Sequence, residues 1–87
     1  MTEAELTELV KRKLYEIAPD IEGEEIVPDE PFADQFEIDS MDLLNFVIAL
    51  HKATGLEIPE ADHGRLVTMA GAVAYLQERT AASSERR

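Results

Sequence analysis

Apolar residues return at every third or fourth position in three stretches of this chain, and that spacing constrains it to a helical fold. The spacing places apolar side chains on one face of an α-helix, whereas no stretch shows the alternation typical of a strand. The first stretch follows a capping-box pattern, Thr2 with Glu5, that marks a helix start. We therefore expect an amphipathic helix over about residues 3–18, with these residues facing the core: Leu6, Leu9, Val10, Leu14 and Ile17.

The second stretch predicts a helix that is apolar on two faces. It should begin at Asp39 or Ser40, both good N-cap residues, and end near Thr54, where Gly55 can cap it. A rotation of 100° per residue places Leu43, Phe46, Val47 and Leu50 in the core stripe. A helix that is apolar on two faces is either buried on both or offers one face to a partner, and with so few helices we expect the second. The alternative is that Leu44 or Ile48 packs under the long loop. That second face comprises Met41, Leu44 and Ile48, bordered by Asn45, His51 and Lys52.

Residues 19–39 form a long loop in this interpretation, because they contain three prolines and only scattered apolar residues. A loop of this length needs anchors in the core, for which Phe32, Phe36 and Ile38 are the candidates. After the second helix, residues 56–66 contain Gly64 and predict one short, marginal helical segment.

Thr68 then starts the last helix, whose apolar stripe is Met69, Ala72, Val73 and Leu76. The fold class is therefore all-α: a small four-helix bundle of three main helices and one short helix, with a long loop between the first two. We expect one domain over residues 1–80 and a polar, disordered tail over residues 81–87.

Charge and composition exclude several classes of function. Eight Lys and Arg against 19 Asp and Glu give a net charge of −11, which disfavours nucleic acid and favours partners with basic patches. The chain has no cysteine, so it has neither a disulfide nor a thiolate nucleophile. It begins with acids rather than a basic, apolar leader and has no run long enough to span a membrane, so we expect a cytoplasmic monomer.

Ser40 lies between two acids, in the sequence IDSMD, at the start of the second helix. A serine here usually caps the helix, and taken alone the motif predicts no more than that. The positive end of the helix dipole can also stabilise a phosphodiester on the serine oxygen. Asp39 and Asp42 would oppose such an anion, and they are better suited to contact a cation or a metal ion brought by a partner.

The run FEIDSMDLLNFVIALHKATGLEIPE resembles the acyl carrier proteins, in which a D-S-L/M motif opens the second helix and an E-I-P stretch follows it. The resemblance covers most of residues 3–79. It implies an acyl carrier domain over 1–80 that catalyses nothing and binds no metal of its own. Ser40 would carry a covalent 4′-phosphopantetheine arm, whose thiol holds acyl groups of a fatty acid, polyketide or specialised lipid pathway.

The resemblance also implies partners. A phosphopantetheinyl transferase would supply magnesium and a base to attach the arm, and acyl-loading and acyl-transfer enzymes would dock through basic or apolar patches. We expect these enzymes to contact a surface around the serine. The predicted partner-binding residues are Asp39, Met41, Asp42, Leu44, Asn45 and Ile48.

The chain departs from the family pattern in two respects. Glu37 stands where carriers of fatty acid synthesis usually have a glycine, so the turn into the second helix should differ. Residues 1–40 hold 13 acids and three bases, whereas residues 41–87 hold six and five, and the second helix lacks the expected acids at Asn45, His51 and Lys52. These departures favour a specialised pathway over general fatty acid synthesis.

Two other functions fit the residues less well. A serine hydrolase needs a base near Ser40, but His51 would lie about 16 Å further along the same helix, and His63 is expected at the surface. The acids of the loop lack the spacing of an EF-hand calcium site. The main alternative is an acidic helical adaptor that binds protein partners without a prosthetic group, in which Ser40 only caps the helix.

Overall fold

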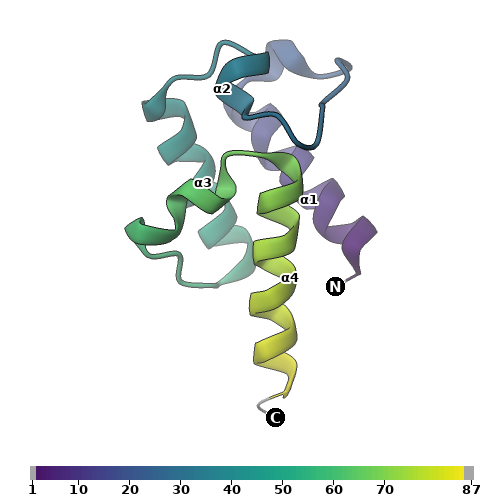
Figure 1. Cartoon of the computed structure of the whole chain (residues 1–87), viewed down its shortest axis with the longest axis vertical. Helices are drawn as coiled ribbons and strands as arrows, with labels where there is room; N and C mark the ends of the chain where they lie inside the picture. The colour runs from purple at the N-terminus through teal and green to yellow at the C-terminus, as the bar shows by residue number, and fades with distance from the viewer. Residues whose placement is uncertain (1, 86–87) are drawn as a thin grey trace.

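Four α-helices and two short 3₁₀-helices form a bundle in the computed structural model, which describes residues 2–85 (Figure 1). No strand occurs among the described residues, so the all-α prediction is confirmed. None of the described helices is both long and apolar enough to cross a membrane. In chain order the elements are α1 (Glu3–Ile17), η1 (Pro19–Ile21), α2 (Phe32–Gln35), α3 (Ser40–Thr54), η2 (Glu60–Leu66) and α4 (Met69–Glu85).

The structure refines two of the expected segments. The long loop contains two short helices, η1 and the single turn α2, which its prolines and scattered apolar residues did not predict. The marginal segment after α3 is η2, a 3₁₀-helix of seven residues. α4 extends to Glu85, and residues 86 and 87 of the expected tail lie outside the described residues.

Local hydrogen bonds explain where the long helices begin and end. The Thr2 hydroxyl accepts from the Glu5 amide at 3.2 Å, and the Glu5 carboxylate accepts from the Thr2 amide at 2.8 Å, so the predicted capping box is present. The Thr68 hydroxyl accepts from the Gly71 amide at 2.9 Å at the start of α4. Gly55 ends α3 with a φ of 73°, a left-handed conformation that glycine adopts without strain.

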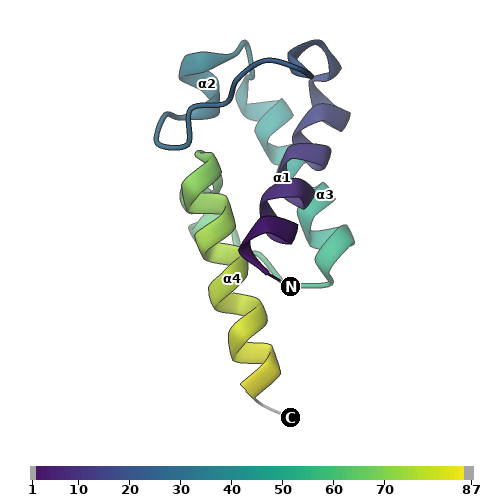
Figure 2. The same ribbon diagram turned by 90° about the vertical axis from the view of Figure 1, so that its right-hand side faces the viewer.

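α1 lies between α3 and α4 and packs against both, while η2 packs against α4. The loop and α2 cover one end of this bundle, as the two perpendicular views show (Figures 1 and 2). α3 begins at the same end, so the predicted functional residue Ser40 lies beside the loop rather than at the far end of the molecule.

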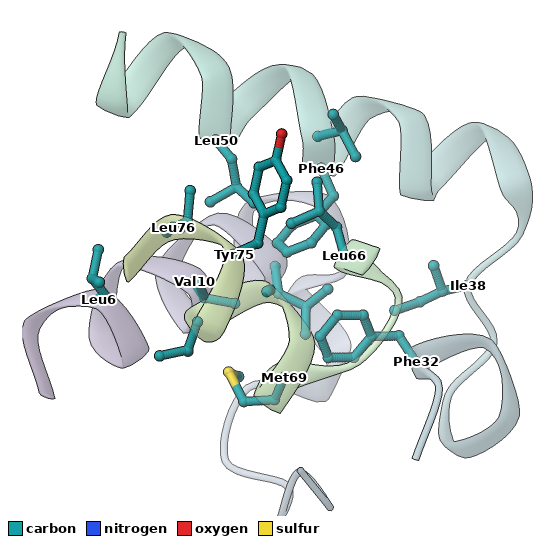
Figure 3. Close-up of a cluster of buried hydrophobic side chains, with 14 of the residues drawn as sticks. Leu6, Val10, Phe32, Ile38, Phe46, Leu50, Leu66, Met69, Tyr75 and Leu76 are labelled. Carbon is teal, nitrogen blue, oxygen red and sulfur yellow. The ribbon is translucent and has the colours of Figure 1, made fainter. Parts of the chain in front are cut away.

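The core joins all the long helices to the loop (Figure 3). Phe32 and Ile38 are buried and Phe36 is half-buried, which confirms them as anchors of the loop. The Phe32 ring meets the Phe46 ring edge to face, with centroids 5.6 Å apart. Leu43 packs against the core, as predicted, and is half-buried because it lies in the first turn of α3 at the rim of the core.

One side chain in α2 organises the loop. The Gln35 side-chain amide donates to the carbonyls of Val27 and Glu30 at 2.9 and 2.8 Å, and its oxygen accepts from the Val27 amide at 2.8 Å. Two backbone bonds then fasten this unit to the start of α4, from the Phe32 amide to the Val67 carbonyl and from the Ala70 amide to the Pro28 carbonyl. The loop is therefore a fixed part of the surface near Ser40.

Candidate functional site

Asp39, and not Ser40, is the N-cap of α3. Its carboxylate accepts from the Asp42 amide at 2.9 Å, and the Asp42 carboxylate accepts from the Asp39 amide at 3.4 Å. This reciprocal pair uses one oxygen of each carboxylate, so each side chain keeps a second oxygen for solvent or a partner. Both acids are thus part of the local structure that starts the helix, a task the motif alone did not reveal.

Ser40 is the first residue of α3, and its side chain is exposed. Among the side chains of residues 2–80, its hydroxyl has no hydrogen-bond partner: the Asp42 amide donates to the Asp39 carboxylate, and the Leu43 amide donates to the Asp39 carbonyl. The first-turn amides and the dipole of a 15-residue helix favour negative charge at this position. The hydroxyl is accessible, and its environment suits a phosphate ester.

A mostly apolar pocket of about 290 Å³ adjoins Ser40. One wall comes from the loop and α2, and the other from the first turn of α3. The pocket is lined by Pro31, Ala33, Ile38, Asp39, Ser40, Leu43 and Val67. Its volume is at the lower end of the range for small-molecule sites, which is large enough for part of an apolar chain attached to the serine.

The second apolar face of α3 is exposed, as predicted from its periodicity. Met41, Leu44 and Ile48 are 64%, 43% and 41% exposed, and Asn45 is exposed beside them. Together with Ser40 they form one continuous stripe along the helix. Val27 in the loop is also 43% exposed.

Glu37 occupies the position of the expected glycine without backbone strain. Among the described residues, only glycines have a positive φ. The turn into α3 therefore uses ordinary backbone angles, and a side chain at this position is tolerated.

The histidines lie away from Ser40. His51 is near the far end of α3, where its Nδ1 is 2.6 Å from the Leu56 carbonyl and so donates to it. With His63 it lines a separate hollow of about 210 Å³ that does not include Ser40. In the part of the chain that the structure describes, no three acidic or histidine side chains are grouped to hold a metal ion.

Comparison with known proteins agrees with this geometry. Residues 4–76 match the family model described as the phosphopantetheine attachment site. The chain is similar to an acyl carrier protein of Rubrobacter xylanophilus, at 32% identity over 74 residues that cover 82% of this chain and 91% of that protein. It is also similar to the meromycolate extension acyl carrier protein of Mycobacterium tuberculosis, at 32% identity over 66 residues.

The second match covers 76% of this chain but only 57% of the mycobacterial protein, so the chain spans little more than half the length of that relative. No solved structure matches the chain.

A small helical bundle with an accessible hydroxyl at a helix start has the architecture of a carrier domain rather than an enzyme. The chain belongs to the phosphopantetheine-attachment family of acyl carrier proteins. Its prosthetic group is covalently attached 4′-phosphopantetheine, whose thiol supplies the thioester linkage to the acyl group. The start of α3 fits this group, since it combines an unengaged hydroxyl, a helix dipole and an apolar pocket.

Proposed function

We propose that Ser40 is the residue that carries the 4′-phosphopantetheine arm. One observation supports this assignment: Asp39 caps α3, and the Ser40 hydroxyl has no structural hydrogen bond among the described residues. In the adaptor alternative, Ser40 itself would be the cap. The N-terminal dipole of α3 would stabilise the phosphodiester at this position.

The exposed stripe of α3 is the proposed docking surface for the enzymes that act on the carrier. Met41, Leu44 and Ile48 would supply apolar contact, and Asn45 a hydrogen-bonding group. Asp39 and Asp42, each with one carboxylate oxygen outside the capping box, would meet basic groups or the metal ion of the transferase. The pocket beside Ser40 would receive the nearest apolar part of the arm or its cargo.

We also propose a specialised lipid pathway for this carrier. One relative is named for meromycolate extension, and α3 lacks acids where carriers of general fatty acid synthesis have them. In this role the protein would be a cytoplasmic monomer that binds first a phosphopantetheinyl transferase and then, one after another, acyl-loading and acyl-transfer enzymes.

Intact mass after incubation with coenzyme A, magnesium and a broad-specificity phosphopantetheinyl transferase tests the attachment residue. The wild-type chain should gain the mass of one phosphopantetheinyl group, and Ser40→Ala should gain nothing. Ser84→Ala, which removes a different serine, is the matched control and should be modified like the wild type. Modification of Ser40→Ala, or an unmodified wild type, would refute the assignment.

A further inference from the structure

A second hollow lies between α1 and α3, on the other side of Ile48 from the histidine-lined one. It has a volume of about 380 Å³, and its lining includes Lys13 and Glu16 from α1 and Asn45, Ile48 and Lys52 from α3. The exposed apolar stripe of α3 therefore leads from Ser40 directly to the rim of this hollow.

The lining of this hollow carries two bases, Lys13 and Lys52, and one acid, Glu16, unlike the acid-rich surroundings of Ser40. From Pro19 through Asp39 the chain has nine acids and no base, whereas α3 has no carboxylate after Asp42. Lys52, which is exposed, forms no ion pair among the side chains of residues 2–80.

Lys13, on the opposite wall of the hollow, pairs with Glu16 at 3.0 Å in a surface bridge whose Lys13 and Glu16 side chains are 21% and 53% exposed. Such a bridge contributes little to stability and is easily exchanged for another partner.

Helix stability explains only part of this arrangement. Lys52 lies in the last turn of α3, where a base interacts favourably with the helix dipole. That interaction requires neither a hollow beside the lysine nor a second lysine across it on α1. In a chain of net charge −11, two lysines that face one depression next to an exposed apolar residue are a local exception.

We propose that the hollow between α1 and α3 receives a carboxylate side chain of a partner enzyme, which pairs with Lys52 and Lys13 while an apolar residue of the same enzyme covers Ile48. This inference rests on the proposed carrier function and specifies its partners. They present basic groups toward the Ser40 end of α3 and an acidic group toward its Lys52 end.

The charge of the whole chain favours a single protein carboxylate over a polyanion as the occupant. A polyanion such as nucleic acid would be repelled by the nine acids from Pro19 through Asp39. A single carboxylate of a partner, next to an apolar residue that covers Ile48, can reach Lys13 and Lys52 without approaching the acids of the loop. The same lysines repel enzymes whose docking surface is basic throughout, so the hollow selects between partners by charge.

A condensing enzyme whose carrier-docking surface is lined with Lys and Arg is the probe. The KM of this enzyme is measured with three acyl-loaded forms of the whole chain as substrate: wild type, Lys52→Glu and Arg12→Glu. The two variants change the net charge equally, but Arg12 lies on another face of α1, beside Ala4, Glu5 and Glu8. Lys52→Ala, which adds no acid at the end of α3, is a third variant, and thermal unfolding confirms that each chain is folded.

Lys52→Glu should lower KM by about two- to fivefold, the range expected for one exposed charge pair, and Lys52→Ala should lower it by less. Arg12→Glu should leave KM unchanged. In 0.5 M NaCl the differences should disappear, because the charges are then screened. In a second series, each Lys or Arg of the enzyme's docking surface is replaced by Glu, one at a time. One of these enzyme variants should have a lower KM for the wild-type chain than for Lys52→Glu, because its new carboxylate can pair with Lys52.

The inference would be overturned if Lys52→Glu and Arg12→Glu changed KM equally. It would also be overturned if every enzyme variant still had a lower KM for Lys52→Glu than for the wild-type chain. These outcomes differ from failure of the proposed function. If Ser40 accepts no arm, the chains cannot be acylated at all, and the mass measurement shows this before any KM is measured. That result would overturn the proposed function together with the inference, whereas normal loading with equal KM values would overturn the inference alone.

Discussion

Two neighbouring side chains, those of Asp39 and Ser40, have different tasks at the start of α3. Asp39 closes the helix end through its bond to the Asp42 amide, and Ser40 presents a hydroxyl that holds no structural contact. Modification of a capping residue would cost the helix its cap. With the cap on the preceding residue, the serine can be modified without loss of the helix start.

Substitution at these two positions should therefore affect stability unequally. Asp39→Ala removes the N-cap and should lower the free energy of unfolding by about 1 kcal/mol, whereas Ser40→Ala should change it little, because alanine is favourable in the first turn. Urea unfolding of both unmodified variants measures the difference. A larger loss for Ser40→Ala would show that the serine hydroxyl is the true cap.

Two glycines near the start of α4 make a second contrast. A Cβ on Gly71 would lie 2.5 Å from the Arg65 carbonyl oxygen and 2.8 Å from the Thr68 hydroxyl, whereas a Cβ on Gly64 would meet nothing within 4 Å. Gly71→Ala should therefore lower the urea midpoint although alanine favours a helix, because the backbone of η2 would have to move. Gly64→Ala should leave the midpoint unchanged or raise it slightly. Equal midpoints for the two variants would mean that η2 yields easily.

At the scale of elements, η2 is held on α4 by polar side chains as well as by the core. The Tyr75 hydroxyl points away from the core cluster (Figure 3) and donates to the Asp62 carboxylate at 2.7 Å. Arg79 donates to the same carboxylate at 2.9 Å, and Arg65 pairs with Glu78 at 2.7 Å. The two guanidinium groups also lie over the Tyr75 ring, about 5 Å from its centre. A segment of low helix propensity is thus stabilised by long-range contacts.

These contacts should make part of the stability depend on pH. The hydrogen bond from Tyr75, supported by Arg79, lowers the pKa of Asp62 below its usual value of about 3.9. A lowered pKa means that the contribution is complete above the unfolded-state value and is lost as the pH falls through the folded-state value. Between pH 5 and about pH 3, the wild type should therefore lose more unfolding free energy than Asp62→Asn does.

Urea unfolding across this pH range makes the comparison. Asp29→Asn, which removes an equal charge from the exposed loop, should behave like the wild type. If Asp62→Asn also follows the wild-type curve, the carboxylate does not contribute through this contact.

At the scale of the whole molecule, a net charge of −11 on 87 residues opposes folding through self-repulsion, most strongly where nine acids lie from Pro19 through Asp39. Raising NaCl from about 10 to 150 mM shortens the screening length from about 30 to 8 Å, so the melting temperature should rise. Thermal unfolding monitored by circular dichroism measures the change. A melting temperature that is constant or falls would mean that the acids are already neutralised within the fold.

Local sequence patterns were enough to predict the helical class, the starts of α1 and α4, the end of α3 and the exposed stripe around Ser40, because periodicity and capping involve residues within four positions of one another. It did not show which of Asp39 and Ser40 is the cap, since both are good caps and only the geometry distinguishes them.

The loop, η2 and the hollows could not be predicted in this way, because they form through packing between distant parts of the chain. The Gln35 bonds to the loop, the Asp62 contact with Tyr75 and the placement of Lys13 and Lys52 on opposite walls of one hollow involve residues from five to 39 positions apart. Such contacts depend on how whole elements pack against one another. No local pattern of residue types encodes them, because side chains so far apart in the chain become neighbours only when the core forms.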